Sequence, residues 1–71
     1  MLSEIDRSLL KEFDHHNVRA DVISKIMNQL STINNKSIFL SYLSENHNLL
    51  ISDGELFHQV YLILHKDNEV K

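Results

Sequence analysis

Apolar residues recur along the chain every three to four positions, in four blocks separated by short polar stretches. This spacing is typical of amphipathic helices that bury one face. It predicts helices over residues 4–15, 18–30, 35–46 and 53–65. The clearest block, in the second of these ranges, consists of Val18, Val22, Ile23, Ile26, Met27 and Leu30. The pattern therefore indicates an all-α fold, a small bundle of three to four short helices.

Small polar residues stand where these helices should begin and end. Ser3 precedes the first helix and Ser52 precedes the fourth, which opens with the capping box Ser52–Glu55. Asn17 is the expected N-cap of the second helix, and Asn34 or Asn35 that of the third. A cap at Asn34 predicts a hydrophobic staple between Ile33 and Ile38, and Ser52 predicts another between Ile51 and Leu56. The third helix is expected to end within 45–48, where an asparagine can adopt the left-handed conformation.

The composition is that of one small globular domain, residues 1–71. The chain has 71 residues, one glycine, no proline and no cysteine. The scarcity of glycine and proline favours helices, and a chain of this length buries only a small core. Without cysteine it lacks disulfides and most structural zinc sites. Self-association is the remaining common source of stability, so we expect a homodimer.

Charge and chemistry narrow the class of function. The net charge of −3 argues against a binder that relies on electrostatic attraction to nucleic acid. No apolar run approaches the roughly 18 residues of a membrane span, and the N-terminus lacks the pattern of a secretion signal. The ten carboxylates and the serines suggest no acid–base pair or nucleophile. We therefore expect a cytoplasmic protein without a membrane partner, without enzymatic activity and without a cofactor.

Histidine is the most unusual component, with five residues, His15, His16, His47, His58 and His65. Metal binding is disfavoured, because His58 and His65 lie two turns apart and metal sites usually show closer pairs. Histidine is charged or neutral depending on pH between 5 and 8. Protonation of all five would change the formal charge from −3 to +2. One hypothesis is therefore pH sensing by His15, His16 and His58; the alternative is that the histidines are solvated surface residues.

The third and fourth predicted helices carry more apolar and aromatic residues than one buried face requires. Such a surplus on a short chain indicates a surface for a partner or for a second copy, although a plain core remains the alternative. The candidates for this interface are Ile38, Phe39, Tyr42, Leu43, Phe57 and Tyr61. The tyrosines suit a half-buried interface because each has an apolar ring and a polar tip.

One stretch resembles a known family. The residues Ile33–Ser41 (INNKSIFLS) are similar to the corresponding segment of the enterobacterial YmgB/AriR family of small biofilm and acid-resistance regulators. A weaker similarity extends through Val22–Met27 and Leu56–Leu64. The resemblance implies a cytoplasmic, all-helical homodimer that acts without catalysis, as a connector protein of a two-component signalling system.

The function expected from these observations is regulation by protein–protein contact, with a bacterial signalling or transcription regulator as partner in a biofilm or stress response. Two alternatives stay open. The first is a DNA-binding transcription regulator of the helix-turn-helix or nucleoid-associated type. The second and third helices have lengths suited to a helix-turn-helix, but the third offers bases only Lys36, Ser37, Ser41, Ser44 and Glu45. An immunity or antitoxin-like inhibitor would also fit the acidic charge.

Overall fold

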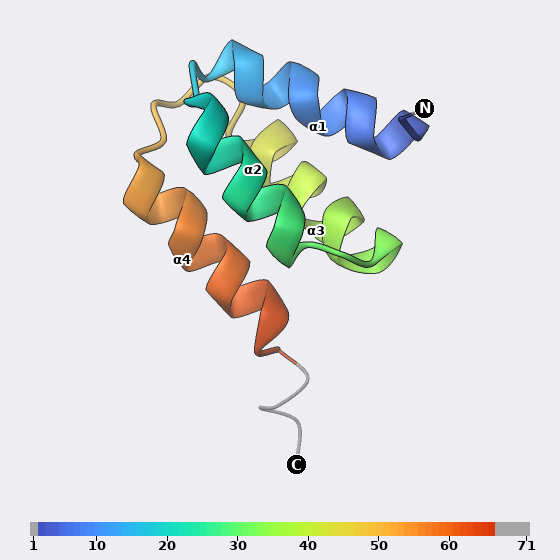
Figure 1. The fold of residues 1–71 in the computed structure, drawn as a ribbon. Helices are drawn as coiled ribbons and strands as arrows, with labels where there is room; N and C mark the ends of the chain where they lie inside the picture. The colour runs from blue at the N-terminus through green and yellow to red at the C-terminus, as the bar shows by residue number, and fades with distance from the viewer. Residues whose placement is uncertain (1, 67–71) are drawn as a thin grey trace.

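Four helices make up the computed structural model, which describes residues 2–66 (Figure 1). They are α1 (Glu4–His15), α2 (Ala20–Gln29), α3 (Ile33–Glu45) and α4 (Asp53–Leu64). The all-α prediction is confirmed, and the described residues contain no strand. Met1 and residues 67–71, which the predicted domain also included, lie outside the described residues.

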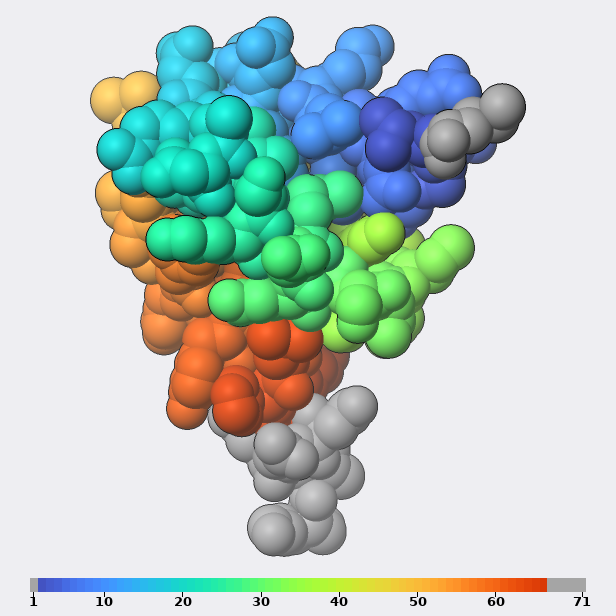
Figure 2. Space-filling model, viewed as in Figure 1, coloured from blue at the N-terminus to red at the C-terminus, as the bar shows by residue number. Residues whose placement is uncertain are grey.

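The helices form two contacting pairs linked through α3 and α4. In Figure 1, α2 and α4 lie side by side at the front, α3 lies behind α2, and α1 crosses the top. The main contacts are α1 on α3, α3 on α4 and α2 on α4. In the space-filling view the side chains of α1, α2 and α4 close over the centre of the front face (Figure 2). Each helix therefore has one face inside the bundle and one outside.

The core consists of ten buried apolar side chains: Leu9, Phe13, Val22, Ile26, Leu30, Phe39, Leu43, Leu56, Val60 and Ile63. All four helices contribute, at the helical spacing that the sequence shows. The rings of Phe13 and Phe39 join α1 to α3, with 5.9 Å between their centroids. Full burial of such a side chain contributes roughly 1.5–3 kcal/mol, so these residues supply most of the driving force for folding.

Three helices begin at a hydroxyl side chain that accepts a backbone N–H bond. Ser3 accepts from Asp6 at 3.2 Å, and Ser52 accepts from Glu55 at 3.2 Å, which confirms the two serine caps. The predicted cap of α3 is wrong, because Thr32 takes that role instead of Asn34 or Asn35. Helix α3 consequently begins at residue 33. Ile33 is then 67% exposed, and the staple between Ile33 and Ile38 is lost.

The turn between α1 and α2 contradicts a second predicted cap, that of α2 by Asn17. Asn17 has φ 58°, the left-handed conformation that ends a helix. Its N–H bonds to the Asp14 carbonyl at 3.1 Å, and that of Val18 bonds to the Phe13 carbonyl at 3.0 Å. These two bonds form a Schellman motif. Asn17 therefore terminates α1 rather than capping α2. The N-cap of α2 is Arg19, which makes no side-chain cap bond.

Candidate functional site

The predicted interface residues do not share one surface. Phe39 and Leu43 are fully buried in the core, so their assignment to a partner surface is wrong for this conformation. Both face inward because α3 is covered by α1 on one side and by α4 on the other. Ile38, Tyr42 and Phe57 are half-buried against the core. Tyr61 is 56% exposed and is the member of the set best placed to meet a partner.

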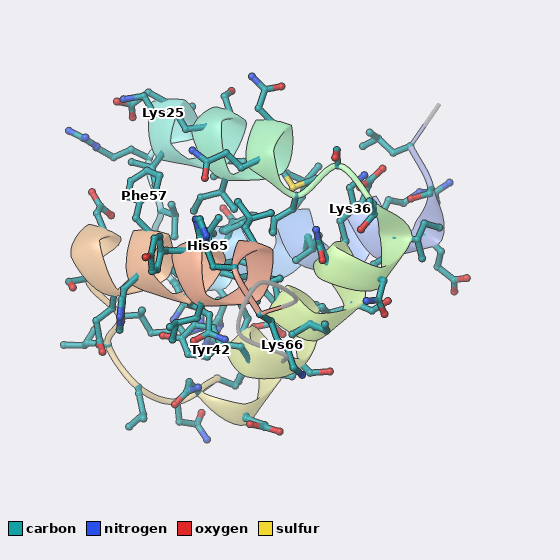
Figure 3. The ribbon with its side chains drawn as sticks, turned by 90° about the horizontal axis from the view of Figure 1, so that it is seen from below. Lys25, Lys36, Tyr42, Phe57, His65 and Lys66 are labelled. Atoms are coloured by element: carbon teal, nitrogen blue, oxygen red, sulfur yellow. The ribbon has the colours of Figure 1, made fainter. Side chains whose placement is uncertain are left out.

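Tyr42 and Phe57 lie on opposite sides of α4, with Phe57 on the side of α2 (Figure 3). Burial, and secondly the charge of Glu55, raises the pKa of the Tyr42 hydroxyl above its ordinary value of 10.0. Tyr42 therefore stays neutral and contributes to the contact between α3 and α4. Because these two rings flank α4 rather than cover its outer face, they do not form a patch together with Tyr61.

The outer face of α4 carries a stripe that we call the α4 stripe: His58, Tyr61, Leu62 and His65. Their spacing of i, i+3, i+4 and i+7 places them on one side of a helix, and all four are exposed. Leu62 is 42% exposed, and Leu64 beside the stripe is 37% exposed. The rings of Tyr61 and His65 stack loosely, with centroids 4.2 Å apart. The middle of α4 thus offers apolar surface to the outside.

A charged residue stands near each end of this helix on one flank. Glu55 lies in the first turn of α4, and Lys66 lies two residues beyond Leu64, after the C-cap His65. The charge of Glu55 acts on the Tyr42 hydroxyl, which places Glu55 on the Tyr42 side of α4. Figure 3 places Lys66 on the side of α4 where Tyr42 lies. Both charged side chains are exposed. The flank is therefore acidic at its start and basic at its end.

Three histidines and a glutamate gather where α1 ends, and we call this group the histidine cluster: Glu12, His15, His16 and His47. His47 comes from the loop after α3. Its ring stacks on that of His15, with centroids 3.8 Å apart and planes 11° apart. His15 and His16 meet edge to face at 5.2 Å. The structure thus unites two of the predicted pH-sensing residues, and leaves the third, His58, exposed on α4.

The polar contacts of the histidine cluster converge on a single carboxylate oxygen. Oε1 of Glu12 lies 3.1 Å from Nδ1 of His47 and 3.8 Å from Nε2 of His16. Nε2 of His15 donates to the backbone carbonyl of His47 at 3.0 Å. The side chain of His16 is 3% exposed, and its buried Nε2 has no hydrogen-bond partner. One carboxylate therefore faces two of the three rings, those of His47 and His16, while His15 is held by the His47 carbonyl.

His47 is the member that the sequence analysis missed. It lies more than thirty residues from Glu12 and His15 along the chain, so no local spacing connects them. The sequence holds no signal for this contact, because the parallel course of α1 and α3 that brings His47 to α1 is not evident from periodicity. Within residues 2–66, no group of three or more histidine, aspartate or glutamate side chains is arranged to hold a metal ion.

A second charged contact joins the other ends of α1 and α3. Nζ of Lys36 lies 2.9 Å from Oδ1 of Asp6, and both side chains are less than one-fifth exposed. The Lys36 ammonium, and secondly the Ser3 hydroxyl, hold the pKa of the Asp6 carboxyl below its ordinary value of 3.8. Lys36 is the basic residue that the helix-turn-helix hypothesis places on its recognition helix. Its ion pair with α1 makes it a poor phosphate or base contact.

One hollow is present beside this ion pair, an open groove between the start of α1 and α3. It is lined by Ser3, Glu4, Ile5, Ser8, Ile33 and Leu40. Its side chains are mainly apolar or hydroxyl-bearing, with one carboxylate, so they provide no acid–base or nucleophilic arrangement. The described helices include none with the length and apolar character needed to cross a membrane.

Comparison with protein-family models, with curated proteins and with solved structures finds no match. The arguments about function therefore rest on the geometry of this chain and on the resemblance of Ile33–Ser41 described above.

Proposed function

We propose that this protein is a non-enzymatic regulatory connector, which acts in the cytoplasm as a homodimer and contacts a bacterial signalling or transcription regulator. The observation that supports the proposal is the exposed apolar surface of the α4 stripe, where Tyr61 is 56% and Leu62 42% exposed. A chain with ten core residues gains little from leaving these side chains in water. The resemblance of Ile33–Ser41 supports a role in biofilm or stress regulation.

The geometry of α4 favours antiparallel pairing with the same helix of a second copy. A twofold axis between Tyr61 and Leu62 sets each of these residues against the other type in the partner. The same axis brings Glu55 of one protomer near the partner's Lys66, because like flanks face each other in an antiparallel helix pair. Two symmetric ion pairs then border an apolar centre, an arrangement common at interfaces. This charge complementarity supports a second copy as the occupant of the stripe.

The dimer is tested by Leu62→Asp. Because Leu62 is 42% exposed, the substitution leaves the core intact, but it buries a carboxylate at the dimer centre. We expect wild-type protein to sediment with twice the chain mass at micromolar concentration, and Leu62→Asp to sediment as a monomer with unchanged helicity. Leu50→Asp is the matched control, because Leu50 is fully exposed on the loop before α4. A monomeric wild type, or loss of the dimer in both variants, would contradict the assignment.

The connector role is tested by affinity purification of tagged protein from an enterobacterial lysate, with and without nuclease. A stoichiometric regulator retained after nuclease treatment supports the proposal. Recovery of nucleic acid and nucleoid proteins alone, lost with nuclease, would favour the DNA-binding alternative. A toxin bound one to one would identify an immunity or antitoxin-like protein instead. The control bait carries Leu62→Asp, which separates partners that need the dimer from those that do not.

A further inference from the structure

The histidine cluster adds polar contacts between two segments that the apolar packing of α1 on α3 already brings near each other. Glu12, His15 and His16 stand at the end of α1, and His47 stands at the start of the loop that leads from α3 to α4. The ring of His47 lies flat on that of His15, and the His47 carbonyl accepts the Nε2–H bond of His15 at 3.0 Å. These contacts fix the start of the loop against α1.

The charges of the cluster are unbalanced in acid. The titratable groups in contact are the carboxylate of Glu12 and the imidazoles of His15, His16 and His47. Lys11, Asp14 and Glu45, the charged residues nearest to the cluster along the chain, are exposed to water. Glu12 balances the first proton taken up by the rings. When two rings are protonated, the cluster has no second carboxylate to balance the second positive charge, and the two protonated rings repel each other.

The rings of His47 and His16 differ in their distance from the Glu12 carboxylate and in their burial. Nδ1 of His47 already faces Oε1 of Glu12 at 3.1 Å, whereas Nε2 of His16 is farther away at 3.8 Å and buried. Burial disfavours the charged form of an imidazole. The ends of α1 and α3 add the negative end of a helix dipole on either side of His47, which favours a cation there. His47 is therefore the ring that pairs directly with Glu12.

His15 is exposed and stacked on the His47 ring, so protonation of both imidazoles would place two positive charges face to face. At 3.8 Å between ring centroids, two unit charges repel even when water screens them fully. Coulomb's law with the dielectric constant of water gives about a sixfold penalty in an equilibrium constant, and weaker screening increases it. The stacking of His15 on His47 therefore stabilises the contact between the loop and α1 when the rings are neutral and destabilises it when both rings are charged.

We propose that Glu12, His15, His16 and His47 form a proton-operated latch, which holds the loop after α3 on the end of α1 near neutral pH and releases it in mild acid. The apolar contact between Phe13 and Phe39 lies deeper and does not titrate, so α1 stays on the bundle when the latch opens. Release frees residues 47–50, which carry the exposed Leu49 and Leu50, while Ile51 stays packed against the core at the start of α4. The latch is separate from the α4 stripe and does not depend on the dimer.

Hydrogen exchange measured by NMR tests the latch at one amide. The Leu49 N–H bonds to the Asn46 carbonyl at 3.0 Å within the held loop. After correction for intrinsic rates, we expect its protection to fall about sixfold or more from about pH 7.5 to about pH 5. The Leu30 amide, bonded to the Ile26 carbonyl at 2.9 Å, reports stability away from the latch. An equal fall at both amides, or none at Leu49, would overturn the proposal.

Variants separate the latch from general acid effects. His15→Gln removes the second charge, and we expect it to abolish the selective loss of protection at Leu49. Glu12→Gln removes the carboxylate that balances the first proton, so release should begin at higher pH. His58→Gln is the matched control, since His58 is exposed on α4, and it should behave as wild type. Selective loss that persists in His15→Gln would contradict the proposal.

The wild-type protein offers a readout that needs no substitution. Nuclear Overhauser contacts between the stacked rings of His15 and His47 should be present near neutral pH and lost in mild acid. Contacts of equal strength in both conditions would show that the rings stay stacked, and would overturn the latch whether or not the variants fold.

Discussion

Helix α1 meets the rest of the bundle through a carboxylate at each end, yet the two ends differ in their cations. At the start, Asp6 pairs with Lys36, whose ammonium keeps its charge throughout the physiological range. At the end, Glu12 faces His47 and His16, whose charges depend on pH. The apolar contact between Phe13 and Phe39 packs α1 on α3 and does not depend on charge. One helix thus combines an attachment with a permanent cation and an attachment whose cations are conditional on pH, and the first is lost only when strong acid protonates Asp6.

The substitution with the largest expected effect removes the buried contact between Phe13 and Phe39, on which the packing of α1 against α3 depends. Phe39→Ala deletes a fully buried ring between α1 and α4, and we expect a loss of about 3–5 kcal/mol in the free energy of unfolding. Because this approaches the whole stability of a small domain, both charged ends should open together. Urea unfolding followed by circular dichroism measures the loss. Leu50→Ala, at a fully exposed position, should be neutral. A Phe39→Ala protein as stable as wild type would show that the apolar contact between Phe13 and Phe39 is not what holds α1 on α3.

A smaller effect is confined to the conditional end. Asn17 holds the left-handed conformation that positions His15 and His16 before the chain turns. Asn17→Ala should cost about 1 kcal/mol, since alanine adopts this conformation less readily. Asn17→Gly should be neutral or slightly stabilising, and it serves as the control. Thermal unfolding measures both. Equal stability of the alanine and glycine variants would contradict the role given to the φ angle of 58°.

The smallest effect is expected at the ion pair between Asp6 and Lys36, and its size depends on pH. The pKa of Asp6 lies below 3.8 in the folded protein, so the pair contributes stability above the unfolded pKa and loses it as pH falls through the folded pKa. Lys36→Met should lower the midpoint of thermal unfolding at pH 7, and the difference should shrink once Asp6 is protonated. Lys25→Met on the exposed side of α2 is the matched control. A difference that is the same at neutral and strongly acidic pH would show that Lys36 acts through its apolar stem rather than its charge.

Local features of this fold were predictable, and contacts between distant segments were not. Ser3 and Ser52 were identifiable as caps because a hydroxyl three residues before a free N–H is a local relation. Thr32 was missed because three polar residues compete for the start of α3, and the packing of α3 decides among them. Periodicity placed Phe39 and Leu43 on an apolar face, but it could not show that two helices cover that face. His47 joins the histidine cluster only through the course of the whole chain.

The parallel course of α1 and α3 has a consequence for the newly made chain. The partners of Asp6, Phe13 and Glu12 on this contact are Lys36, Phe39 and His47, all far downstream. A ribosome that adds about 5–20 residues per second needs roughly two to seven seconds to supply the 35 residues that separate Glu12 from His47. Throughout that interval the apolar face of α1 has no native surface to cover it. Helix α1 can therefore complete its contact with α3 only after residues 36–47 have been made.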